Sequence, residues 1–208
     1  MALANYADLV ASIGTWLSRS DLASQAPDFI AMAEAEFNRV LRTVDMEIVK
    51  TATLTGEAIA MPSDFMGLRS MSVDNTTFQQ ITPSELFDIR NNVTGTPYYV
   101  AVMDGQFFFR PVPSSGTIKI TYYQRIPGLS VSNTTNWLMT RAPDLYLMAS
   151  LAQAEFYGWN DDRLPMIKDR VDEILAQLNA ETAKVRYGGR RLQAKAPNMS
   201  NVTPGLQA

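Results

Sequence analysis

The sequence predicts an α+β fold: a helical bundle formed by helix pairs at both ends of the chain, an inserted antiparallel β module and an extended C-terminal arm. Apolar residues recur at helical spacing near both ends, whereas the middle is rich in β-branched and aromatic residues separated by turn signals. With 208 residues, 46% of them hydrophobic, the chain can bury a sizeable core. We expect an N-terminal helix pair (1–45), the β module (46–136), a C-terminal helix pair (137–187) and a flexible basic and polar arm (188–208).

The N-terminal part predicts two amphipathic helices. Residues 5–19 form one apolar stripe and residues 29–41 a second, with Pro27 suited to the first turn of the second helix. Because the connection is short, we expect the two helices to pack antiparallel. Glu34 and Glu36 are two residues apart and point in different directions, so we interpret them as part of a solvated helix face.

The middle of the chain predicts strands. Asp104-Gly105 lies between two apolar runs and favours a type I′ hairpin turn. The alternating residues 117–123 follow, and we interpret the three runs as a three-stranded meander extended by earlier strands at 46–54 and 68–73. Thr82-Pro83-Ser84-Glu85 fits a capping box at the start of a short helix.

Helical patterning returns after a polar loop at residues 130–136. Pro143 can open a third helix. Residues 160–162 (Asn-Asp-Asp) offer an N-cap for a fourth helix, and Gly188-Gly189 offers its C-terminal stop. We prefer this cap interpretation of Asp161 and Asp162 to a metal site, because two adjacent carboxylates lack the convergent oxygens that calcium requires.

Composition argues against catalysis. The chain contains no Cys and no His, which excludes thiol nucleophiles, disulfides, Cys-based zinc sites and Ser-His-Asp triads within it. No pair of carboxylates stands out as a catalytic pair, so we expect no enzyme activity and no cofactor. We also expect no membrane association, because no apolar run approaches the length of a membrane span and the N-terminus lacks a signal-peptide pattern.

Charge is distributed unevenly along the chain. The formal net charge is −3, but five of the 18 basic residues and no acidic residue lie between Lys184 and Ala208, which leaves 13 basic and 21 acidic residues elsewhere. An acidic body with a basic tail indicates that the tail meets a different partner. We predict a docking arm for a protein partner, with nucleic-acid binding or an inert tail as alternatives; its candidate residues are Lys184, Arg186, Tyr187, Arg190, Arg191 and Lys195.

The predicted sheet is rich in aromatic residues, which could stack single-stranded bases. Few basic residues accompany them, and adjacent aromatics on a strand face opposite sides. We therefore favour a core together with a subunit interface. The aromatic residues concerned are Tyr98, Tyr99, Phe107, Phe108, Phe109, Tyr122 and Tyr123.

A series of segments over about residues 5–187 resembles the head-to-tail adaptor (head-completion or connector) proteins of short-tailed bacteriophages. The resemblance lies in the order and spacing of the segments, none of which is a catalytic signature. They include Tyr6-x-x-Leu9, Pro27-x-Phe29-Ile30-x-x-Ala33-Glu34, Met61-Pro62-x-Asp64-Phe65, Gly95-x-Pro97-x-Tyr99, Tyr122-Tyr123-x-x-Ile126-Pro127-x-Leu129 and Pro143-Asp144-Leu145-Tyr146-Leu147.

The resemblance implies a virion structural protein that assembles as a ring, usually a dodecamer, beneath the portal at the capsid vertex. It implies partners at both ends: the phage portal protein, reached by the C-terminal segment, and the tail nozzle protein, in some members with tail fibres. Double-stranded DNA would pass through the central channel without sequence-specific binding, and assembly would take place in the host cytoplasm. The alternative function is a nucleic-acid-binding module that uses the basic tail and the aromatic sheet.

Overall fold

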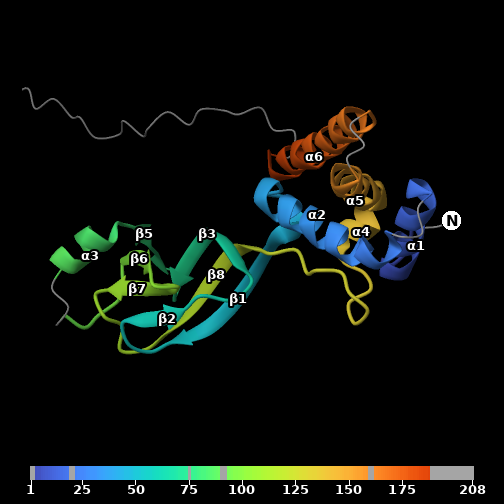
Figure 1. The fold of residues 1–208 in the computed structure, drawn as a ribbon. Helices are drawn as coiled ribbons and strands as arrows, with labels where there is room; N and C mark the ends of the chain where they lie inside the picture. The colour runs from blue at the N-terminus through green and yellow to red at the C-terminus, as the bar shows by residue number, and fades with distance from the viewer. Residues whose placement is uncertain (1–2, 19–21, 75, 90–92, 159–161, 188–208) are drawn as a thin grey trace, which may run out of the picture.

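The structure is a computed structural model that describes residues 3–18, 22–74, 76–89, 93–158 and 162–187. Most helices gather at one end of the molecule and two β-sheets lie at the other (Figure 1). The α+β class is therefore confirmed. The helical end contains α1 (Tyr6–Leu17), η1 (Ala23–Gln25), α2 (Ala26–Val40), η2 (Val44–Met46), α4 (Trp137–Arg141), α5 (Pro143–Tyr157) and α6 (Leu164–Tyr187).

Local signals set the ends of several helices. The Asn5 side chain caps α1 by accepting a 3.0 Å hydrogen bond from the Asp8 amide. Pro27 lies in the first turn of α2, as predicted, and Pro143 opens α5. The short helix α4 was not expected; Asn136 caps it by accepting from the Met139 amide. Of the residues predicted to cap and stop the last helix, Asn160, Asp161 and Gly188-Gly189 lie outside the described residues.

Helix α5 is the centre of the helical end, because α1, α2 and α6 all pack against it. Nine of its 15 residues are buried, so it shows no single apolar stripe. The two predicted N-terminal helices form as α1 and α2, and each contacts α5 more extensively than it contacts the other. Their apolar stripes are directed at the same central helix.

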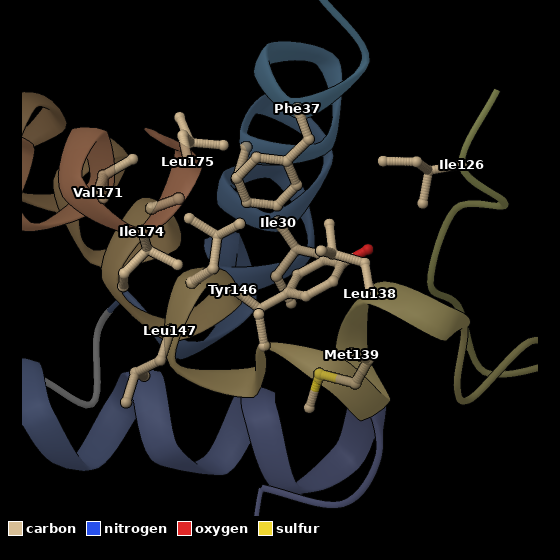
Figure 2. Close-up of a cluster of buried hydrophobic side chains, with 14 of the residues drawn as sticks. Ile30, Phe37, Ile126, Leu138, Met139, Tyr146, Leu147, Val171, Ile174 and Leu175 are labelled. Atoms are coloured by element: carbon tan, nitrogen blue, oxygen red, sulfur yellow. The ribbon is translucent and has the colours of Figure 1, made fainter. Parts of the chain in front are cut away.

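The core of the helical end is assembled around Tyr146 of α5. Its ring meets the Phe37 ring of α2 edge-on, with centroids 5.2 Å apart, and Ile30 and Leu138 lie close by (Figure 2). Val171, Ile174 and Leu175 of α6 close the cluster on another side (Figure 2), and each fully buried aliphatic side chain stabilises the fold by roughly 1.5–3 kcal/mol.

The β module consists of two four-stranded sheets, ordered β1-β8-β3-β4 and β2-β7-β6-β5. Pairing is antiparallel except between β5 and β6. The strands are β1 (Glu47–Leu54), β2 (Ala58–Ala60), β3 (Phe65–Val73), β4 (Thr76–Thr77), β5 (Gln79–Gln80), β6 (Tyr99–Met103), β7 (Gln106–Arg110) and β8 (Gly116–Gln124). Helix α3 (Pro83–Asp88) begins with the predicted capping box between Thr82 and Glu85.

The prediction of a three-stranded meander is wrong for its third strand, β8. The hairpin β6–β7 forms, and Asp104 and Gly105 both have positive φ, as a type I′ turn requires. Strand β8, however, pairs with β1 and β3 in the other sheet. A strand has two edges; those of β7 are taken by β6 and β2, and the Pro111-Val112-Pro113 segment carries the chain across to the second sheet.

The two sheets bury a separate core between them. Phe107 and Phe109 of β7 face Leu54, Ile118 and Tyr122 of the other sheet. This core is distinct from that of the helical end, and β8 contributes to both: Tyr122 belongs to the core of the module, and the adjacent Tyr123 to the core of the bundle. Neighbouring residues of a strand point to opposite faces, so one strand can join two cores.

Candidate interaction site

The predicted docking residues begin in the last turn of α6. Lys184 and Arg186 lie on this helix, Lys184 exposed and Arg186 half-buried, and the helix ends at Tyr187. Arg190, Arg191 and Lys195 lie outside the described residues. Docking by these residues stays a prediction, but the structure gives the position from which the predicted arm begins.

Arg186 connects α6 to the β module. Its Nη2 donates to Glu47 Oε1 at the start of β1 and to Tyr123 Oη at 2.5 Å, and reaches the Arg42 carbonyl at 3.4 Å. Its guanidinium also lies 5.6 Å from the centroid of the Tyr123 ring. Arg186 was predicted as part of the arm, but the structure shows it engaged in an internal contact.

Arg69 of β3 completes this arrangement, which we call the junction cluster (Arg42, Glu47, Arg69, Tyr123 and Arg186). Its Nε lies 3.2 Å from Glu47 Oε1, and its guanidinium is 5.6 Å from the Tyr123 ring centroid. Glu47 therefore pairs with two arginines that both contact the same aromatic ring. The cluster involves α6, β1, β3 and β8, and the charge-assisted contacts of Arg186 fix the module to the end of α6.

A second set of contacts holds the C-terminal half of α6. Arg141 of α4 pairs with Asp45 of η2 and, at 2.7 Å, with Glu181 of α6. The Asn179 side chain accepts from the Arg42 amide at 3.3 Å. The segment before β1 is thus attached to α6 at several points, which fix the position of the C-terminal end of this helix.

Glu34 has a structural role that the sequence interpretation missed. Its Oε1 accepts from the Leu129 amide at 2.7 Å and from Tyr146 Oη at 3.1 Å. Burial raises the pKa of Glu34, opposed by these two hydrogen bonds. The expectation of a solvated face is therefore wrong for Glu34. Its spacing of four residues from the buried Ile30 was the signal that could have revealed this.

Asp64 likewise joins elements of the β module by accepting hydrogen bonds. It accepts from Tyr122 Oη and Gln124 Nε2, each at 2.8 Å, and lies 3.3 Å from Lys50 Nζ. Burial tends to raise the pKa of Asp64, but the hydrogen bonds from Tyr122, Lys50 and Gln124 outweigh it and hold the pKa below its usual value. These contacts tie the turn before β3 to β1 and β8.

Two hollows in the surface of the molecule are lined by residues of the elements described above. An apolar pocket of about 330 Å³ lies between α1, α5 and α6, with Trp16 and Met166 at its rim. A larger cleft of about 560 Å³ lies where α2 meets β3, and it is lined by three arginines: Arg39, Arg42 and Arg125. Arg39 and Arg125 have no acidic partner among the described residues.

The aromatic residues of the module do not form an open stacking surface. Phe107, Phe109, Tyr122 and Tyr123 are buried in the two cores, whereas Tyr98 is 53% exposed. This burial fits the preferred interpretation of these four residues as core, whereas Tyr99 of β6 and Phe108 of β7 are half-buried.

The polar clusters of this molecule join elements of the fold to one another. Across the part of the chain that is described, no three His, Cys, Asp or Glu side chains are placed to hold a metal ion, and no helix is long and apolar enough to cross a membrane. Polar contacts of this kind fix the bundle and the β module to one another.

A family model described as SU10 adaptor protein matches residues 4–197, and the chain belongs to this family. The resemblance to phage head-to-tail adaptors is thereby confirmed at the level of the family, and the protein is a structural adaptor of a phage virion. A search of curated proteins gave no match.

Proposed function

We propose that this adaptor forms a ring at the neck of the virion, joins the portal to the tail and lines part of the DNA path, with residues 188–208 docking on the portal. The observation that carries the proposal is the attachment of α6 by the junction cluster. An arm that begins at a fixed point can be presented in the same way by every copy of a ring, and repeated weak docking then gains avidity.

Charge supports a passage for DNA. Outside residues 184–208, acidic residues exceed basic ones by eight per chain, and a ring multiplies this excess. An acidic wall repels the phosphate backbone and lets DNA slide without being held. The basic arm suits the opposite task, which is to bind an acidic groove on a protein partner.

The two ends of the molecule suit two partners. The bundle, from which the arm begins, would face the portal, and the β module at the other end would face the tail nozzle and any fibres (Figure 1). Ring number and assembly in the host cytoplasm belong to the same proposal.

Native mass spectrometry of the purified protein, alone and mixed with the portal protein of the same phage, tests this function. We expect a ring bound to portal, whether the free protein is monomeric or already a ring. Absence of portal binding in both cases would contradict the proposal. Steeply salt-dependent binding of the isolated protein to DNA would instead favour the nucleic-acid-binding alternative.

A further inference from the structure

The apolar pocket between α1, α5 and α6 is open to solvent in the single chain. Trp16 of α1 is 55% exposed and Met166 of α6 is 68% exposed, while Leu151 of α5 forms part of the floor. Exposed apolar side chains around an apolar hollow indicate a docking surface.

Two arginines flank this pocket, Arg163 immediately before α6 and Arg170 within it. Arg163 and Arg170 are seven residues apart, which corresponds to about 10.5 Å along a helix. The Arg163 side chain is 59% exposed, and its Nε lies 4.0 Å from the buried Glu155. Arg170 meets two half-exposed acids, Glu173 at 2.6 Å from Nη1 and Asp144 at 3.9 Å from Nη2. Exposed pairs such as those of Arg170 are weak, and most of the Arg163 side chain faces solvent, so both arginines can share an incoming carboxylate.

Helix α2 carries a surface with the complementary pattern. Met32 is 45% exposed at the middle of the helix, with Asp28 four residues before it and Glu36 four residues after it. Residues at this spacing lie on one side of a helix, and the two acids are about 12 Å apart along the axis. An apolar side chain between two acids thus matches an apolar pocket between two arginines.

The two surfaces lie on opposite flanks of α6 and cannot meet within one chain. Met166 and Arg170 line the pocket, whereas Lys168 and Asp172 of the same helix line a different groove that includes Glu36. A contact between them needs a second copy, and it joins two different surfaces. Repetition of such a heterologous contact generates a ring when the rotation closes.

We propose that Met32 of one copy inserts into the apolar pocket of the next copy, with Asp28 and Glu36 facing its Arg163 and Arg170. This inference rests on the proposed function, because it gives the contact by which the ring would be built. The occupant is a second copy of this chain.

Cysteine cross-linking tests the contact directly, because the chain has no cysteine of its own. We expect a mixture of Met32→Cys and Met166→Cys chains, assembled with portal and oxidised, to form covalent dimers, and neither variant alone to do so. The Met32→Cys, Met166→Cys double variant should form a ladder of higher species. A matched pair, Met166→Cys with Val185→Cys, should give no ladder, since Val185 is equally exposed but lies outside both surfaces.

Introducing a charge at position 32, which would enter the pocket of the next copy, tests the contact independently through its effect on ring formation. Met32→Glu should weaken ring formation at least tenfold without a change in Tm, while Val185→Glu should leave the ring intact. If wild-type rings form on portal but the cysteine pair does not cross-link and Met32→Glu assembles normally, this interface is wrong and the proposed function stands. If no ring forms with wild-type protein, the proposed function fails, and this contact with it.

Discussion

Arg186, in the last turn of α6, pairs with Glu47, the first residue of β1, across 139 positions of sequence. Glu47 also pairs with Arg69, and both arginines contact Tyr123. Glu47 therefore joins the end of the bundle, through Arg186, to the start of the module, where it also pairs with Arg69.

Glu47→Gln should destabilise this junction. The half-buried Arg186 and the more exposed Arg69 would lose their shared countercharge, so we expect the free energy of unfolding to fall by about 1–3 kcal/mol. Denaturant titration of both proteins measures the difference. Asp88→Asn is the matched control, because Asp88 is an exposed acid of α3, and equal effects of the two substitutions would argue against the junction cluster.

Glu34 should give the protein an unusual dependence on pH. Burial raises its pKa above the ordinary 4.5, so the native state binds a proton more readily than the unfolded chain. The contribution of Glu34 to stability therefore falls as pH rises from about 4.5 through the raised pKa. Relative to Glu34→Gln, wild-type protein should lose stability over this range. Thermal unfolding across pH 4–7 checks this, and a gain would contradict it.

Asp64 should change the stability of the protein with pH in the opposite direction to Glu34. Its pKa in the folded protein lies below the ordinary 3.8, so its stabilising effect is present above 3.8 and is lost as pH falls through the lower folded value. Asp64→Ala removes the acceptor of the Tyr122 hydroxyl and should cost about 1–3 kcal/mol at neutral pH. Ser63→Ala, at the exposed neighbouring position, should have little effect on Tm.

Truncation of the chain after Tyr187 should separate folding from docking. All described elements end by this residue, so the shortened protein should keep its Tm. We expect it to lose portal binding, measured by pull-down or native mass spectrometry. Portal binding by the truncated protein would count strongly against the docking role of residues 188–208.

Reversal of two arm charges should affect assembly alone. Arg190→Glu combined with Arg191→Glu should weaken portal binding with almost no change in Tm, because the last described helix ends before them, at Tyr187. Arg186→Ala should instead lower Tm, since it removes the contacts with Glu47 and Tyr123. Strong destabilisation by the Arg190 and Arg191 changes would place those residues in the fold.

Local sequence signals predicted much of the fold because the interactions behind them join residues that are close in the sequence. The stripe ending at Leu41, the capping box at Thr82 and the Asp104-Gly105 turn each depend on residues a few positions apart. The resemblance that led to the adaptor family likewise depends on ordered segments along the chain.

The tertiary structure decided what neighbouring patterns cannot express. Strand β8 pairs with β1 and β3 and not with the preceding strand β7, the half-buried Glu34 accepts hydrogen bonds from Leu129 and Tyr146, and Arg186 joins the bundle to the module. The sequence by itself determined most of the longer helices and strands and that the chain resembles an adaptor. Strand partners and ion pairs arise between residues far apart in the chain, where the choice depends on which edges and charges remain unpaired once the elements have packed.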